Sequence, residues 1–183
     1  MILTKAFLNE QVQKRAIFES IDEQSLKIRD EYDVFISYSS NDKNFAILIY
    51  QLLEKHGYTA YIDLNDPILN PQKVSDKTAE RLIDKMRKCK GLLYLYSRSS
   101  SVSKWCPWEV GIFSGIKNFR CANLPIINNK GENFRNQEYL ELYPYIEFEK
   151  IQDKDMYDFW VCESEVIYTN LRDWLNGGQL RSH

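Results

Sequence analysis

Histidine and closely spaced cysteines are scarce in this sequence. It contains only two histidines, His56 and His183, and its four cysteines include no pair at CxxC spacing. A structural zinc site combines several such ligands at short spacings, so we expect no bound metal. A chain of 183 residues can bury a sizeable core without a disulfide framework, and the cytoplasm is the expected compartment.

Long apolar runs and blocks of one charge are also missing. No window approaches the roughly 20 apolar residues that a membrane span needs, and the first fifteen residues lack the features of a secretory signal. The 24 basic and 26 acidic residues are interspersed and leave a net charge of −2. We therefore expect neither a membrane segment nor a nucleic-acid partner, because binding to nucleic acid requires a continuous basic surface.

Apolar strands alternate with amphipathic helices from Tyr32 onward. The pattern predicts strands at 32–39, 59–64, 91–97, 123–128 and 143–149, helices at 43–56, 77–89 and 105–118, and a long closing helix at 156–178. This order is typical of an α/β protein with a flavodoxin-like, five-stranded parallel sheet and helices on both faces. We expect a domain at 31–177, preceded by an N-terminal helical arm at 1–30 and followed by a tail at 178–183.

Ligands of such sheets bind beyond the carboxyl ends of the strands, so the loops found there define the candidate site. The loops "SYSSND" and "SRSSSVSK" contain no glycine, which argues against the phosphate cradles of flavodoxins and dinucleotide-binding proteins. A phosphoacceptor domain would carry acidic residues where this chain has Ser37 and Tyr38. His56 ends a helix at the opposite edge of the sheet and His183 ends the chain, so a nucleophile–histidine pair is not expected there.

Glu109 stands on an otherwise apolar helix face, together with Trp105, Ile112, Phe113 and Ile116. Pro107 suits the first turn of a helix, which would place Glu109 close to the positive end of the helix dipole. The sequence leaves two interpretations open: a solvated carboxylate at a helix end, or a functional group facing the crevice. In the second case we expect the dipole to offset burial and to keep Glu109 ionised at neutral pH.

A run of serines follows the third predicted strand and also allows two interpretations. Small polar residues before a helix mostly serve turns and caps. The alternative is contact with substrate hydroxyls, for which Ser97 is the candidate.

The segments "YDVFISYSSND", "TAYIDLNDP" and "GLLYLYSRSSSVSKWCPWEVG" resemble, in this order, the successive boxes of Toll/interleukin-1 receptor (TIR) domains. The resemblance runs from about Tyr32 to Trp174 and includes the WxxxE arrangement of Trp105 and Glu109. It implies the flavodoxin-like fold. It also implies cleavage of the nicotinamide–ribose bond of NAD, with NAD as a substrate and no further cofactor.

In the enzymatic branch of this family a glutamate after the third strand is catalytic, and Glu109 matches that position. The resemblance places Tyr38 and Ser39 on the pocket floor, Asp63 at the start of the loop that covers substrate, and Trp105 beside Glu109. The loop "NDPILNPQKVSD" lacks the Pro-Gly pair often found there.

The resemblance further implies self-association through TIR surfaces and a role in antiphage defence of the Thoeris kind, where a separate effector senses the product. Two alternatives stay open on the sequence: a non-catalytic TIR scaffold and a nucleoside-processing enzyme such as a deoxyribosyltransferase.

Overall fold

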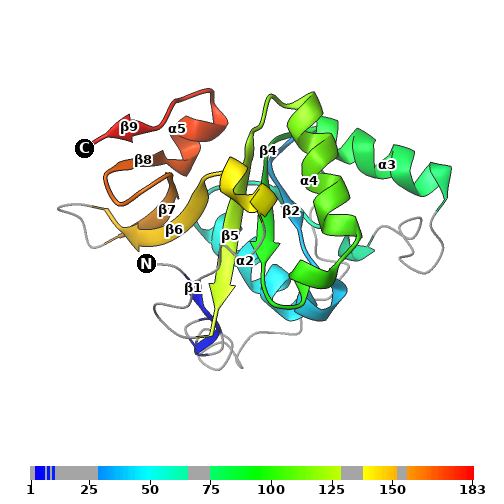
Figure 1. The fold of residues 1–183 in the computed structure, drawn as a ribbon, viewed down its shortest axis with the longest axis horizontal. Helices are drawn as coiled ribbons and strands as arrows, with labels where there is room; N and C mark the ends of the chain where they lie inside the picture. Colours follow the sequence, from blue (N-terminus) through cyan, green and yellow to red (C-terminus); the bar gives the residue numbers. More distant parts are fainter. Residues whose placement is uncertain are drawn as a thin grey trace.

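A computed structural model describes residues 3–6, 8, 10, 29–65, 75–128, 138–151 and 156–183. Within these ranges nine strands form one sheet, in the order β3-β2-β4-β5-β6-β7-β8-β9, and β1 also pairs with β5 (Figure 1). The strands are β1 (Leu3–Thr4), β2 (Tyr32–Ser37), β3 (Ala60–Tyr61), β4 (Cys89–Tyr96), β5 (Cys121–Ile127), β6 (Tyr145–Lys150), β7 (Tyr157–Cys162), β8 (Ile167–Asn170) and β9 (Arg181–Ser182). The α-helices are α2 (Lys43–Lys55), α3 (Asp76–Arg87), α4 (Trp105–Ile116) and α5 (Leu171–Leu175), and the 3-10 helices are η2 (Ser40–Asp42), η3 (Asp63–Asn65), η4 (Ser100–Val102) and η5 (Glu138–Leu142).

The first part of the sheet confirms the predicted fold class. Strands β3, β2, β4, β5 and β6 are parallel neighbours in this order. In flavodoxin-like sheets the second strand of the chain likewise lies at the edge, beside the first. The central strand β4, "CKGLLYLY", is buried at every position except Lys90. A run without polar alternation is what a parallel strand covered on both faces requires.

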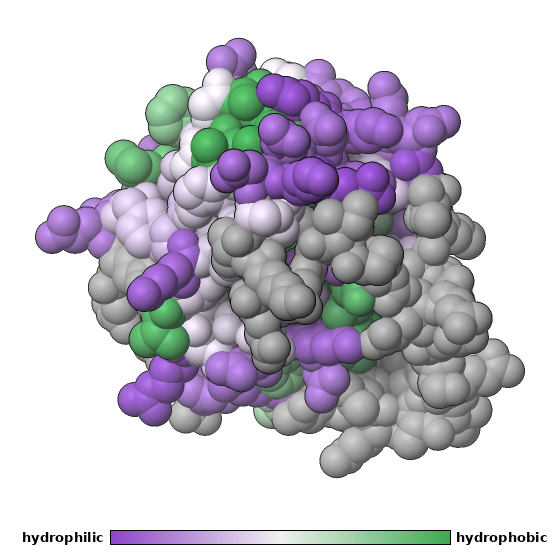
Figure 2. Space-filling model, turned by 90° about the vertical axis from the view of Figure 1, so that its right-hand side faces the viewer, coloured by the Kyte–Doolittle hydropathy of each residue, from purple (hydrophilic) through white to green (hydrophobic). Residues whose placement is uncertain are grey.

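Helices cover both faces of this sheet. Residues of α2 and α5 join one buried hydrophobic cluster, and residues of α3 and α4 join the other. Helix α3 buries Thr78, Leu82 and Met86, which are spaced four residues apart, and turns its charged residues outward. Figure 2 views the molecule from the side on which α3 lies in Figure 1, and the residues coloured there are mostly hydrophilic.

The sheet is wider than predicted, because the closing segment forms a hairpin instead of one long helix. The prediction of a helix over 156–178 was wrong: β7 and β8 pair antiparallel beside β6, and only Leu171–Leu175 are helical. Aromatic and β-branched residues dominate this segment, and in β7 Phe159 and Val161 point into the core between less buried neighbours. This alternation with period two outweighs the weaker helical spacing.

Both ends of the chain enter the sheet. Leu3–Thr4 pair with Ile126 and Ile127 of β5, beyond the single position at which β6 pairs with β5. The prediction of a helical arm at 1–30 was therefore wrong at Leu3–Thr4, which form a strand. Residues 5, 6, 8 and 10 are helical, as predicted, and residues 11–28 lie outside the described residues. The predicted tail at 178–183 also needs correction, since Arg181–Ser182 pair with β8.

No helix in the described ranges combines the length and hydrophobicity that a membrane crossing needs.

Candidate active site

A pocket of about 440 Å³ lies beyond the carboxyl ends of β2, β3 and β4, where the sequence placed the candidate site. This volume is within the range of small-molecule sites. The loops after these three strands and the helices α2, α3 and α4 supply its walls. The lining residues are Tyr38, Ser39, Ser40, Asn41 and Lys43 after β2, Asp63 and Leu64 after β3, Thr78 and Leu82 of α3, Ser99, Val102 and Ser103 after β4, and Trp105 and Glu109 of α4.

Glu109 lies in this pocket with only 8% of its surface exposed. Helix α4 begins at Trp105, so Glu109 is its fifth residue and stands in the second turn. The helix begins where the sequence predicted, and Glu109 lies just past its first turn rather than within it. The carboxylate oxygen Oε2 accepts a hydrogen bond from Ser37 Oγ at 2.5 Å.

Burial raises the pKa of the Glu109 carboxyl from its ordinary value near 4.5 to about 8. The Ser37 hydrogen bond lowers this pKa and the negative charge of Asp63 raises it, but burial is the largest influence. The expectation that the helix end would offset burial and keep Glu109 ionised at neutral pH was therefore wrong, because the effect of burial on this pKa is the larger one. At pH 7 the carboxyl is mostly protonated, and a strongly perturbed carboxyl in a pocket is typical of a functional site.

Tyr38 and Asp63 stand together beside Glu109. The Tyr38 hydroxyl and the Asp63 carboxylate are hydrogen-bonded, and burial together with Asp63 raises the pKa of Tyr38. Ser39 continues the same wall and is buried. The structure thus brings four predicted site residues, Tyr38, Ser39, Asp63 and Glu109, into one pocket.

Trp105 also lines the pocket, and its other side packs into the protein. Its ring meets that of Trp108 edge to face, with centroids 5.2 Å apart, and both rings pack against the cluster of α3 and α4. The side chain therefore serves as pocket wall and as part of the core.

Ser97 is the predicted site residue that the structure places outside the pocket lining. It is 1% exposed, and its Oγ donates to Asp42 Oδ2 at 2.5 Å. Ser97 Oγ also accepts hydrogen bonds from the backbone N–H groups of Ser99 and Ser100. Ser97 thus organises its loop, as the turn-and-cap interpretation states, while Ser99 and Ser103 line the pocket instead.

Sequence reasoning missed two residues that bear on the site, Ser37 and Lys43. Ser37 ends β2 with its side chain on the side of α4, and Lys43 opens α2 at the pocket rim. Ser37 is one residue before Tyr38, so strand alternation would have shown that the two side chains point to different sides. Its partner could not be found in this way, because Glu109 lies 72 residues away in the chain.

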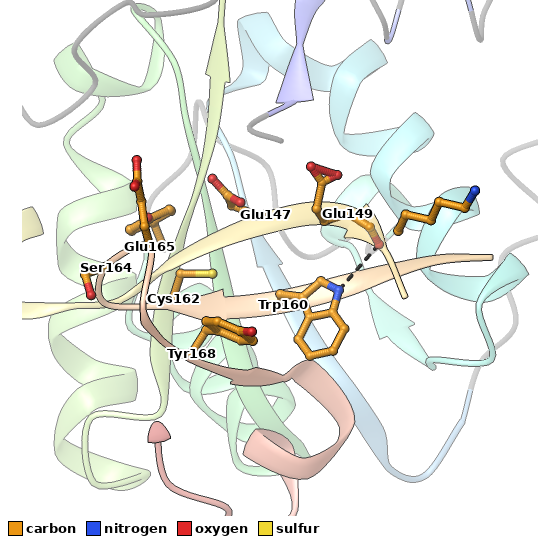
Figure 3. A pocket seen from close by; sticks show the side chains of 9 residues that line it. Glu147, Glu149, Trp160, Cys162, Ser164, Glu165 and Tyr168 are labelled. Carbon is orange, nitrogen blue, oxygen red and sulfur yellow. Dashed lines mark hydrogen bonds between the residues drawn. The ribbon is translucent and has the colours of Figure 1, made fainter. Parts of the chain in front are cut away.

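A second pocket of about 270 Å³ lies on β6, β7 and β8 and shares no lining residue with the first (Figure 3). Glu147, Glu149 and Glu165 surround it, and Trp160 Nε1 donates to the Glu149 carbonyl oxygen at 3.4 Å. It contains no predicted site residue. In the part of the chain that the structure describes, no group of three His, Cys, Asp or Glu side chains is placed to hold a metal ion.

The fold and the pocket together define the class of protein: it is an α/β protein with a flavodoxin-like sheet and a buried carboxyl at the strand ends. A family model described as "TIR domain" matches residues 34–159, so the chain belongs to the TIR domain family, as its motifs predicted.

Two known proteins show the range of this similarity. A Bacillus cereus (strain MSX-D12) protein named "Probable 3' cyclic ADP-D-ribose synthase ThsB'" is 36% identical over 162 residues, which cover 86% of this chain and 83% of that protein. The crystal structure of the TIR domain of the Toll-related receptor TRR-2 from Hydra magnipapillata has a TM-score of 0.45 and 21% identity, over 62% of this chain and 82% of the other.

Proposed function

We propose that this protein is a TIR-domain enzyme that cleaves the nicotinamide–ribose bond of NAD and releases a cyclised ADP-ribose. The observation that carries the proposal is Glu109, a buried carboxyl with a raised pKa that lines the pocket at the strand ends. The similarity to ThsB′ supports the cyclising branch of this chemistry, with 3′ cyclic ADP-ribose as the product.

The proposed reaction explains why a single carboxyl is sufficient. Nicotinamide leaves as a neutral molecule, so its departure needs no general acid. The barrier is the positive charge that develops on the ribose, and a fixed carboxylate stabilises that charge without having to reorganise. The reaction in this form takes NAD as its substrate and uses no further cofactor.

The raised pKa of Glu109 fits a substrate that brings its own positive charge. The nicotinamide ring of NAD is a cation, and an opposite charge nearby favours the ionised form of a carboxyl. NAD binding is therefore accompanied by loss of the Glu109 proton, and the carboxylate forms where the cation is to be stabilised.

The proposed cellular role rests on the comparison with ThsB′ and on the motifs. The similarity to ThsB′ and the motif order favour antiphage defence of the Thoeris kind, in which a separate effector senses the cyclised product. We further propose that the protein acts in the cytoplasm and self-associates through TIR surfaces, as members of this family do.

The test is incubation of the purified protein with NAD, followed by mass spectrometry of nicotinamide and the nucleotide product. Glu109→Gln should lower turnover about 10²–10³-fold, because it removes a preorganised charge and preserves shape. Glu80→Gln on the exposed side of α3 is the matched control and should retain activity. If E109Q turned over NAD like the wild type, the catalytic assignment would be wrong. A folded wild-type protein without any turnover would favour the non-catalytic scaffold.

A further inference from the structure

Ser37 is the last residue of β2 and is buried beside the pocket. Strand β2 lies between β3 and β4, and Ser37 is in register with Tyr94 of β4. The residue is 1% exposed, so its hydroxyl must find its partner inside the protein. It donates to Oε2 of Glu109 at 2.5 Å, and it is also hydrogen-bonded to the buried Cys106 thiol.

The Ser37 hydroxyl does not line the pocket and reaches it through Glu109. Glu109 lines the pocket, whereas Ser37 does not. The hydrogen bond occupies Oε2 and leaves Oε1 without this contact. A side chain on a central strand thereby limits the orientations of a carboxyl on α4, and an orientation held before the reaction is what electrostatic stabilisation requires.

The groups around Glu109 give the Ser37 hydroxyl a second effect. Asp63 of η3 places a negative charge near Glu109, while Tyr38 and Cys106 are buried and have raised pKa values, which keeps both neutral. Hydrogen-bond donation to a carboxyl favours its ionised form. Among these neighbours, Ser37 is the one whose influence lowers the pKa of Glu109.

We propose that Ser37 is a positioning residue that orients Glu109 and helps it to ionise when substrate binds. The role of Ser37 in turnover rests on the proposed NAD-cleaving function. Its effect on the Glu109 carboxyl does not, and can be measured without substrate.

The first experiment follows the Glu109 carboxyl by ¹³C NMR in protein carrying ¹³Cδ-labelled glutamate, with E109Q to assign the signal. Ser37→Ala should move the titration midpoint of Glu109 upward by about one to two pH units, since a hydrogen bond to a charged group contributes on that scale. Ser114→Ala is the matched control: Ser114 is a buried serine of α4 whose hydroxyl bonds to Val110 O and Tyr143. It should leave the midpoint unchanged.

The second experiment measures turnover of NAD across the same pH range. S37A should lower kcat about 10- to 100-fold with little change in KM, and its kcat/KM profile should shift upward together with the NMR midpoint. Ser37→Thr retains a hydroxyl and should restore most of the loss. If S37A fails to fold, Ser37→Cys keeps the volume, replaces the hydroxyl by a weak donor and serves for the same comparison.

An unchanged Glu109 midpoint in folded S37A, or in S37C where that variant replaces it, would overturn the proposal. So would a profile that shifts equally in S114A. An upward shift of the midpoint in a protein whose wild type does not cleave NAD would uphold the link between Ser37 and Glu109 and overturn the proposed function instead.

Discussion

Burial makes the Glu109 carboxyl difficult to ionise, and the stability of the protein should reflect this. Its pKa is near 4.5 ordinarily and about 8 in the folded protein. Between these pH values the folded protein retains a proton that the unfolded chain has released, so the free energy of unfolding falls as the pH rises.

Glu109→Gln should therefore stabilise the protein, and increasingly so toward alkaline pH. Gln cannot ionise, so the advantage of E109Q should be small at pH 5 and reach at most several kcal/mol by pH 8.5. Urea unfolding of both proteins at pH 5, 6.5 and 8.5 measures the difference. E80Q should show no such trend, and a difference for E109Q that stays constant with pH would contradict the raised pKa.

Trp105 should matter more for catalysis than its place in the core alone would require. Trp105→Ala would admit water to the pocket beside Glu109 and leave Trp108 without its edge-to-face partner. We expect a large loss of NAD turnover, while Trp105→Phe, which retains an aromatic wall, should recover much of it. Turnover and melting temperature are measured for both. If W105A lost the roughly 3–5 kcal/mol of a buried aromatic while its folded fraction turned over NAD normally, Trp105 would be a core residue only.

At the scale of elements, a buried hydrogen bond joins two loops that carry pocket residues. Asp42, after β2, accepts from Ser97, after β4, and both side chains are buried. Burial raises the pKa of Asp42, whereas the Ser97 hydroxyl and the charge of Lys5 lower it. The loops that carry Ser39 and Ser99 to the pocket are thereby held in one arrangement.

Ser97→Ala should weaken substrate binding without removing any pocket-lining side chain. It leaves the buried Asp42 carboxylate short of a donor, so we expect a stability loss of about 1–3 kcal/mol and a rise in KM. Ser101→Ala is the control in the same loop, because the Ser101 hydroxyl donates to Arg98 O, three residues away. Steady-state kinetics and thermal unfolding of both variants make the comparison. Wild-type KM in S97A would show that the hydrogen bond does not shape the pocket.

At the scale of the whole molecule, the parallel sheet carries the pocket and the antiparallel hairpin of β7 and β8 extends the sheet away from it (Figure 1). In the TIR family, the loop after the second strand often completes the pocket of a neighbouring subunit. Residues 67–71 of that loop lie outside the described residues, so their part in assembly stays a prediction.

Self-association, if it completes the pocket, should appear in the kinetics. We expect NAD turnover to rise more than linearly with protein concentration, and changes at Pro67 and Pro71 to lower it without unfolding the protein. Specific activity is measured over a dilution series beside sedimentation velocity. Strictly linear activity down to the dilute monomer would argue for a self-contained site.

The sequence by itself determined the parallel core of the sheet and the edge at which the pocket lies. Buried parallel strands are recognisable in a sequence as apolar runs. The residues that follow these strands meet at one edge of the sheet. The strand-end rule placed the loops, the apolar helix face singled out Glu109, and the resemblance to TIR domains selected Tyr38, Ser39, Asp63 and Trp105, all of which line the pocket. The hairpin of β7 and β8 was missed because its aromatic residues also satisfy a helical spacing.

Only the tertiary structure decided how Glu109 behaves. Its pKa depends on burial and on Asp63, and its orientation depends on Ser37, none of which local periodicity can show. The same holds for Ser97, whose hydroxyl turns away from the pocket to Asp42 on another loop. Periodicity tells which face of an element a residue occupies, whereas hydrogen bonds and desolvation depend on which distant elements pack against that face.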